Sequence, residues 1–171
     1  MKMENSALGF MLLFFISSCN NNHQTTMEQF RGMWRLDKYE AFDSTSNKWL
    51  DAPKRIGYSG YILYDGAGHV GVQLFPPTFK KFNDTASIDS LNINELKEMA
   101  TIQSKCFVYF ADCTISAGQN IIEHHIKSSN HPADVGTTAK RNFEFKSDTL
   151  ILTAIELIGG FKTRLRWIKC K

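Results

Sequence analysis

Hydrophobic and polar residues alternate with a period of two along most of the chain after residue 30. Runs of this kind occupy residues 33–42, 59–65, 69–75, 113–116, 120–128, 140–146, 149–157 and 161–170. A period of two is that of a β-strand, in which successive side chains point to opposite faces of a sheet. Short turns containing Gly, Ser or Asp separate many of the runs. Regularly spaced antiparallel strands of this length predict an all-β sandwich or barrel.

One segment has a helical period instead. Between residues 92 and 110, apolar or long side chains recur every three or four positions, at Leu96, Ala100, Gln103, Phe107 and Phe110. Asn92, followed three positions later by Glu95, resembles a capping box, in which each side chain binds the backbone N–H group of the other residue. The pattern predicts one helix inserted between strands, near residues 92–110. We expect Tyr109 at the end of this helix.

The first residues predict an export signal rather than a part of the fold. The apolar run from Ala7 to Ile16 is shorter than the roughly 20 residues of a membrane-spanning helix and has the length of a signal-peptide core. The sequence ISSC that ends at Cys19 resembles the lipobox of bacterial lipoproteins. The resemblance implies a signal peptide over residues 1–18 and lipid on Cys19, which would attach the protein stably to a membrane. A plain secretory signal with a chance cysteine is the alternative.

Residues 19–26 would then be the lipidated cysteine and a polar tether, NNNHQTT. The tether contains no Asp or Glu. In some bacteria an acidic stretch at this place directs export to the cell surface, so its absence favours a periplasm-facing protein in the bacterial cell envelope. Residues 27–171 contain no internal repeat and no hinge-like linker, and we expect them to form one domain.

Composition and charge argue against a disordered chain and against a nucleic-acid-binding protein. The 171 residues are 43% hydrophobic and 22% charged, which is typical of a folded domain and not of a disordered chain. The formal net charge is +3, and Lys and Arg are scattered. A nucleic-acid-binding protein needs a clustered basic face, so we expect no nucleic-acid partner.

Three further cysteines, Cys106, Cys113 and Cys170, follow Cys19. Because their number is odd, they cannot all pair with one another. Their spacings do not fit a zinc module. One disulfide in an oxidising compartment and three free thiols both remain open.

Three segments together resemble a known family. They are FRGMWRL (30–36), SGYILYDGAGHVGVQLFPP (59–77), and the run from YFADCTIS (109–116) to GTTAKRNFEFKSDTLILT (136–153), followed by RLRWIK. In this order, over about residues 28–170, they are similar to the lipocalin-like proteins of bacteria and fungi. The resemblance implies a closed antiparallel barrel of about eight strands around a cavity that can hold one small ligand.

The pair Gly32-x-Trp34 is the signature of this family at the start of the first strand. The resemblance implies that Trp34 closes one end of the barrel and that a basic side chain of the last strand lies over its ring. Arg166 is the first candidate for that side chain and Arg164 the second. We assign this contact a structural role only.

Two adjacent histidines lie in the run NIIEHHIKSS (120–129). On a strand, His124 and His125 point to opposite faces, so they cannot bind one metal ion together, and no other set of ligands is visible. We therefore expect no metal. Ile122 and Ile126 share the face of His124, which should point into the barrel, whereas His125 shares its face with Glu123 and should meet solvent.

The next strand divides in the same way. Arg141 shares a face with Phe143 and Phe145, so all three should point inward or towards the rim. An arginine buried without a partner is costly. A protein carboxylate, an anionic ligand, or extension of the side chain into water at the strand end could each satisfy Arg141.

The two tyrosines of SGYILYD (59–65) lie on opposite faces, and alternation alone does not say which points inward. We expect Tyr61 to do so. In the following strand Val70, Val72 and Leu74 should line the interior. Tyr109 is expected at the cavity mouth.

Three kinds of function remain open. The first is a lipid-anchored protein that binds a small apolar or amphipathic ligand, including an anion, through His124, Arg141, Tyr61, Tyr109, Phe143 and Phe145. The second is an enzyme that uses the same cavity, with His124 as general acid or base and Arg141 stabilising an anion. The third is a barrel filled by its own side chains. No nucleophile motif and no cofactor fingerprint is present, so we assign no catalytic residue and no cofactor.

Overall fold

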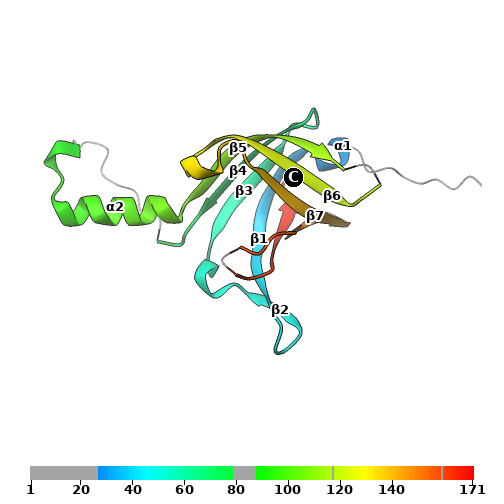
Figure 1. Ribbon diagram of the computed structural model, residues 1–171, viewed down its shortest axis with the longest axis horizontal. Helices are drawn as coiled ribbons and strands as arrows, with labels where there is room; N and C mark the ends of the chain where they lie inside the picture. Colours follow the sequence, from blue (N-terminus) through cyan, green and yellow to red (C-terminus); the bar gives the residue numbers. More distant parts are fainter. Residues whose placement is uncertain (1–26, 79–87, 117, 159) are drawn as a thin grey trace, which may run out of the picture.

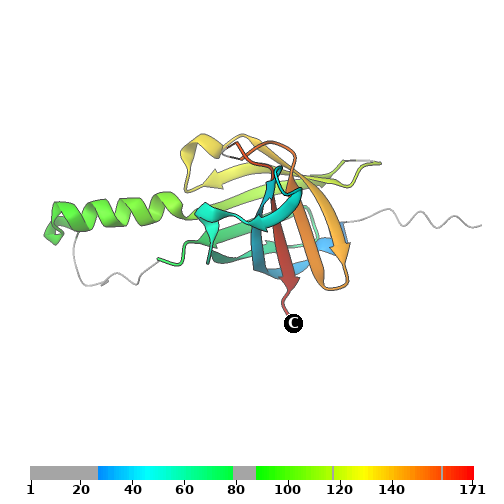
Figure 2. The same ribbon diagram turned by 90° about the horizontal axis from the view of Figure 1, so that it is seen from below.

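The alternating runs form one antiparallel sheet that closes on itself. The computed structural model describes residues 27–78, 88–116, 118–158 and 160–171. The eight barrel strands are β1 (Gly32–Asp43), β3 (Ser59–Tyr64), β4 (His69–Phe75), β5 (Phe107–Ile115), β6 (Ile121–Ser129), β7 (Thr138–Lys146), β8 (Thr149–Ala154) and β9 (Thr163–Lys169). Each of these eight strands pairs with the one named after it, and β9 also pairs with β1 (Figures 1 and 2). The closed antiparallel barrel of about eight strands is confirmed.

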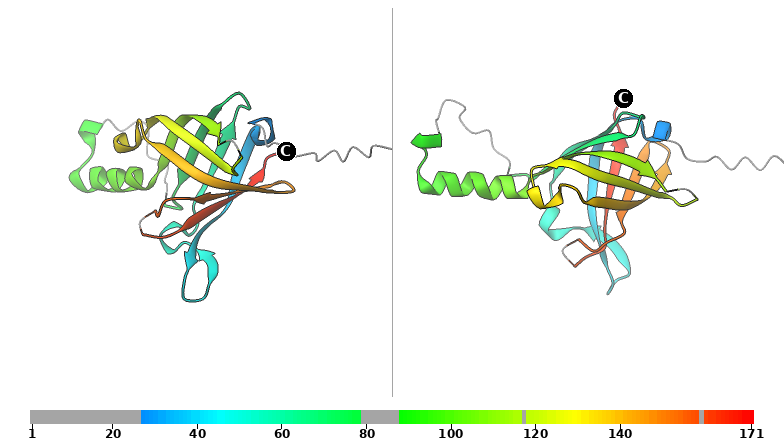
Figure 3. Two further views of the ribbon diagram at one scale, coloured as in Figure 1. Left: turned by 45° about the vertical axis from the view of Figure 1, so that its right-hand side comes forward. Right: turned by 45° about the horizontal axis from the view of Figure 1, so that its top comes forward.

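The closing pair of strands runs from Trp34, opposite Lys169, to Ala41, opposite Thr163. Closure gives both edge strands a partner, so the barrel keeps no open edge along this seam. The short strand β2 (Lys48–Asp51) was not predicted. It pairs only with the far end of β1, and the hairpin that it forms extends beyond the barrel (Figure 3).

The inserted helix is α2 (Ile93–Lys105), and its capping box is present. The side-chain oxygen of Asn92 accepts hydrogen bonds from the backbone N–H groups of Asn94 and Glu95 at 2.9 and 3.2 Å. The carboxylate of Glu95 accepts one from the backbone N–H of Asn92 at 2.8 Å. Within α2 only Ile102 is buried, because the helix extends away from the barrel (Figure 1).

The predicted end of this helix near residue 110 is wrong. The helix ends at Lys105, Cys106 is extended, and β5 begins at Phe107. The helical spacing continued by chance, because Phe107 and Phe110 also fit a strand. Pairing with β4 and β6 satisfies the backbone here and overrides the local period.

Aromatic side chains fill one end of the barrel. The short helix α1 (Met27–Phe30) places Phe30 there, with its ring 4.9–5.1 Å from the rings of Tyr64, Phe143 and Phe145. The indole N–H of Trp34 donates a hydrogen bond to the backbone oxygen of Phe30 at 2.8 Å. These rings form the closed end. The C-terminal end of β9 lies at the same end as α1 (Figure 3).

The side chain over Trp34 is Lys169, not Arg166 or Arg164. The ammonium nitrogen of Lys169 lies 5.0 Å from the centre of the Trp34 ring. The reason is alternation: Lys169 shares the inner face of β9 with Trp167, whereas the two arginines are on the outer face. Arg166 is 3.5 Å from Asp37, and Arg164 pairs with Glu40 at 2.7 Å.

Gly32 begins β1 with φ +117°, in the region that only glycine adopts easily. Cys106, Cys113 and Cys170 are free thiols, so the disulfide that the sequence left open does not form among them. Cys19 lies outside the described residues. In the described part of the chain, every helix is too short or too polar to cross a membrane.

Candidate functional site

The barrel interior contains a buried chain of three polar side chains, Tyr64, His124 and Tyr109. His124 is on β6, points inward and is only 1% exposed. The hydroxyl oxygen of Tyr64, from β3, lies 2.9 Å from its Nε2 atom. The hydroxyl oxygen of Tyr109, from β5, lies 2.7 Å from its Nδ1 atom. Both ring nitrogens therefore have a hydrogen-bond partner from another strand.

Burial controls the protonation of this chain. It lowers the pKa of His124 to about 3, because the charged imidazolium loses its hydration; the nearby charge of Arg141 adds to the effect. Burial also raises the pKa values of Tyr64 and Tyr109 well above their ordinary range. All three side chains are therefore uncharged at neutral pH.

A cavity of about 90 Å³ lies beside this chain. Its wall is formed by Tyr39, Arg55, Ile62, Val72, Leu74, Phe107, Tyr109, His124, Arg141, Leu152, Ile158, Leu165 and Trp167. Tyr64 separates it from the closed end, since the Tyr64 ring lies 5.1 Å from that of Phe30 and 5.7 Å from that of His124. A second, more open hollow of about 310 Å³ shares Arg55 and Phe107 with the cavity, and we call this side of the cavity its mouth.

The cavity wall carries two arginines and no carboxylate. One guanidinium nitrogen of Arg141 donates to the backbone oxygen of Lys140 at 2.9 Å. One of Arg55 donates to the Tyr58 hydroxyl at 2.7 Å, and this guanidinium also lies over the Tyr58 ring. Among the described residues, no acidic side chain pairs with either arginine. The protein carboxylate that could have neutralised Arg141 is therefore not found there.

Trp167 also lines the cavity and carries a buried donor without a partner among the described residues. It is 1% exposed, and its indole Nε1 atom is buried without a hydrogen-bond partner in the described structure. An indole nitrogen can only donate. Trp167 alternates with the two arginines of RLRWIK and shares a face with Leu165, so the sequence pattern could have identified it, although it was not predicted. Arg55 could not, because it lies in the short 3₁₀ helix Pro53–Arg55.

The expectation for Tyr61 is wrong. Tyr61 is 44% exposed on the outside, and Tyr64 is the tyrosine that points inward. The register explains this, because Ile62 pairs with Val72 and Tyr64 with Val70, and cross-strand partners share a face. The inward face of β4 was predicted correctly. To deduce the inward face of β3 from it, one needs to know which residues pair across the turn at residues 65–68.

Three other residues that we expected to contact the ligand, Phe143, Phe145 and Tyr109, do not lie in the expected place relative to the cavity. Phe143 and Phe145 point inward but pack on Phe30 at the closed end, outside the cavity wall. Tyr109 is in the cavity wall, but as a buried residue of β5 rather than at the mouth and the end of a helix. Arg141 and His124 both line the cavity, as their alternation predicted.

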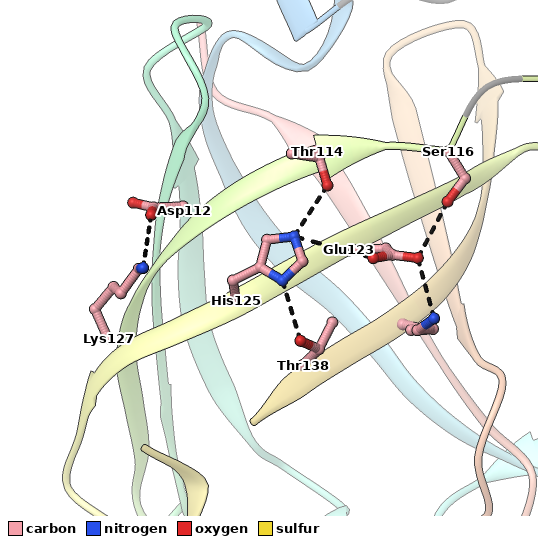
Figure 4. Close-up of polar contacts among 8 residues, drawn as sticks. Asp112, Thr114, Ser116, Glu123, His125, Lys127 and Thr138 are labelled. Atoms are coloured by element: carbon pink, nitrogen blue, oxygen red, sulfur yellow. Dashed lines mark hydrogen bonds and ion pairs between the residues drawn. The ribbon is translucent and has the colours of Figure 1, made fainter. Parts of the chain in front are cut away.

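His125 belongs to a separate polar network on the outer face of β5, β6 and β7 (Figure 4). Its two ring nitrogens lie 3.0 Å from the hydroxyl oxygens of Thr114 and Thr138. Glu123 beside it accepts from Ser116 at 3.1 Å and pairs with Lys140 at 3.2 Å, which holds the Glu123 pKa below its usual range. The two histidines therefore serve different faces of the barrel.

Within the described residues, no group of three or more His, Cys, Asp or Glu side chains is placed to hold a metal ion. What the site offers is hydrogen-bond donors set in an apolar wall. A closed antiparallel barrel with such an interior belongs to the class of barrels that can hold one small ligand.

The sequence model of the lipocalin-like domain matches residues 31–169, and the chain belongs to the lipocalin-like domain family. No curated protein and no solved structure matches the chain significantly. A barrel of this family fits the binding of a small hydrophobic ligand in general.

Proposed function

We propose that this protein binds a small amphipathic anion, fatty-acid-like in character, inside the barrel. The observation that carries the proposal is the charge of the cavity wall, where Arg55 and Arg141 have no acidic partner among the described residues. The remaining wall is mostly apolar or aromatic. The acidic group of the ligand would meet Arg141, and its apolar part would meet the wall.

Desolvation of the guanidinium favours an anionic ligand. A guanidinium that faces an apolar cavity loses part of its hydration, and this loss is costly unless an opposite charge or strong acceptor replaces the water. A ligand carboxylate supplies both, and hydrogen bonds between charged groups contribute about 1.5–3 kcal/mol each. An anion is therefore favoured over a neutral molecule of the same shape.

The cavity limits the size of the buried part. At about 90 Å³ it is smaller than the roughly 300–1,000 Å³ of pockets that enclose a drug-sized ligand. A short-chain carboxylate suits this volume. A longer chain would extend through the mouth, where the hollow beside Arg55 and Phe107 has about 310 Å³.

The enzyme hypothesis finds less support in the geometry. A histidine whose pKa is lowered to about 3 is a weak base at neutral pH and lacks the second, acidic imidazolium proton that a general acid would give. Both of its nitrogens are occupied by tyrosine hydroxyls. These contacts favour a binding role for the cavity.

Binding of octanoate and of its neutral analogue octanamide, by displacement of a fluorescent fatty acid, tests the proposal. Arg141→Met should weaken octanoate at least tenfold, or about 1.4 kcal/mol, and leave octanamide within about twofold. His125→Ala, on the outer face, is the matched control and should change neither. Equal losses for the two ligands, or no binding of octanoate by the unchanged protein, would show that the ligand class is wrong.

We also propose that the protein is a lipoprotein of the bacterial cell envelope, held at the membrane through Cys19 and facing the periplasm. The support is the apolar run at residues 7–16, the lipobox-like ISSC and the acid-free tether. A membrane-bound position suits an amphipathic ligand, because such molecules partition into lipid.

A further inference from the structure

The Tyr64–His124–Tyr109 chain carries one more proton than it needs for its own hydrogen bonds. We infer that this proton lies on the Tyr109 hydroxyl, and that Tyr109 and Trp167 donate hydrogen bonds into the cavity to an acceptor oxygen of the ligand. The inference rests on the proposed function for the ligand, whereas the proton positions rest only on the burial of His124 and on the hydrogen-bond geometry around it.

The protonation of His124 determines how many protons the two hydrogen bonds use. A neutral imidazole has one N–H donor and one bare nitrogen that can only accept. The two tyrosines contact opposite nitrogens, at 2.9 and 2.7 Å. One tyrosine must therefore donate to the bare nitrogen, and the other must accept from the N–H group. The accepting tyrosine keeps its own proton, which is free for a third partner.

The surroundings decide which tyrosine keeps the free proton. Tyr64 is 0% exposed, lies outside the cavity wall and contacts the Phe30 ring. Its hydroxyl has no partner other than His124 in the described structure, so a proton directed away from His124 would be buried without an acceptor. Tyr109 lines the cavity, where a ligand or water can accept.

All hydrogen bonds of the Tyr64–His124–Tyr109 chain therefore point in the same direction, towards the cavity. The hydroxyl of Tyr64 donates to Nε2 of His124, the Nδ1–H group donates to the hydroxyl oxygen of Tyr109, and the hydroxyl of Tyr109 donates into the cavity. His124 acts as a positioning residue, because its Nδ1–H group occupies the lone pair of Tyr109 and turns the Tyr109 proton towards the ligand.

Trp167 supports the same ligand chemistry independently. Its buried indole N–H has no acceptor in the described protein, and the residue lines the same cavity as Tyr109 and Arg141. The residues that carry two neutral donors and a cation therefore line one small cavity whose wall, in the described residues, contains no carboxylate. An oxygen with two lone pairs, in a carboxylate or an amide carbonyl, matches the neutral donors, whereas Arg141 selects for charge.

The first arm of the test is a long-range ¹H–¹⁵N correlation spectrum of the His124 ring in the unchanged protein. We expect a protonated Nδ1 and a bare Nε2 throughout pH 5–8. Protonation of Nε2 alone, or of both nitrogens at pH 7, would overturn the assignment. This arm needs no ligand and no variant, so it decides the proton positions even if octanoate does not bind and the proposed function fails.

The second arm measures octanoate and octanamide binding to Tyr109→Phe. Since both ligands carry an acceptor oxygen, both should bind about tenfold more weakly, unlike the charge-selective loss in Arg141→Met. Tyr61→Phe removes an equivalent hydroxyl from the outer face and should bind as the unchanged protein does. Unchanged binding to Tyr109→Phe, or a loss confined to octanoate, would overturn the donor role of Tyr109.

Discussion

His124 is a neutral side chain inside the barrel, although a histidine in water is half protonated near pH 6.5. Its burial and the charge of Arg141 both disfavour the imidazolium form, and they lower its pKa to about 3. The two tyrosines that contact it are uncharged as well. This single residue therefore couples the stability of the barrel to pH.

We expect acid to destabilise the protein through His124. Below about pH 6.5 the unfolded chain binds a proton at His124 that the folded protein does not bind until about pH 3, so stability is full above pH 6.5 and falls with pH across that window. Between pH 7 and pH 5 the loss from this residue should be about 2 kcal/mol. Chemical denaturation at both pH values measures it.

His124→Gln is the control, because glutamine does not titrate. Other titrating groups, such as His69 with its raised pKa, are present in both proteins and cancel in the difference. The two proteins should differ in their pH response by the same 2 kcal/mol. An NMR titration in which the His124 ring takes up a proton above pH 5 would contradict the prediction.

Residue positions were predictable where alternation alone decides them. His124, Arg141 and the valines of β4 point inward as expected, because Ile122, Phe143 and Leu74 mark the inner face of each strand. The hydrogen-bond partners of His124 were not predictable. For Tyr64, the local pattern did not decide which face of β3 points inward. For Tyr109, it wrongly predicted a helix where β5 begins.

The hairpin of β3 and β4 depends on a glycine. Gly60 has φ +153°, and a Cβ atom at this position would lie 2.0 Å from the backbone oxygen of Gln73 on the paired strand. Neither strand can move without breaking the register that places Tyr64 and Val70 inside. Gly71 on β4 differs, because its Cβ atom would meet only the ring of Phe110, which is exposed.

Gly60→Ala should therefore lower the free energy of unfolding by about 2 kcal/mol or more, through backbone strain and overpacking. Gly71→Ala should change it by less than about 1 kcal/mol, since the Phe110 ring can move into solvent. Urea denaturation of both variants measures the difference. Similar losses in the two variants would show that β3 and β4 are not as closely paired at Gly60 as described.

At the scale of elements, hairpins with short turns were predictable and the junction of α2 with β5 was not. The turn at residues 65–68 and the capping box at Asn92 are local signals, and the hairpin and the start of α2 form where expected. The segment from Phe107 to Phe110 fits both a helix and a strand. Its state depends on pairing with β4 and β6, which are distant in the sequence. The strand β2 is only four residues long, so it shows too little alternation to be predicted, and it too depends on its pairing with β1.

For the whole molecule, alternation left a sandwich and a barrel both open, and the family resemblance favoured the barrel. The pairing of β1 with β9 joins residues more than 120 positions apart, as in the contact of Tyr39 with Leu165. The volume of the cavity could not be predicted, because it depends on how the rings of the closed end and the arginines of the wall fill the interior. The short alternating strands nevertheless predict the all-β class and the inward direction of His124.

The two ends of the barrel differ in structure. The described chain begins with α1, which packs at the closed end through Phe30, whereas Arg55 and Phe107 lie at the mouth. A lipid anchor on Cys19 would join the barrel at the closed end and leave the mouth free. Lipidation at Cys19 would therefore leave the mouth free for the ligand proposed above, and the anchor can be tested without disturbing the cavity.

Cys19→Ser should release the protein from membranes. Acyl chains contribute about 0.8 kcal/mol for each buried methylene group, and in the described residues no helix could replace them as an anchor. Fractionation after a carbonate wash, in cells labelled with a fatty acid, should find the unchanged protein labelled and in the pellet and the variant unlabelled and soluble. Cys170→Ser, which removes a half-buried thiol of the barrel, is the matched control and should stay labelled in the pellet. If Cys19→Ser remains in the pellet after the wash, another part of the protein holds it at the membrane and the lipoprotein hypothesis fails.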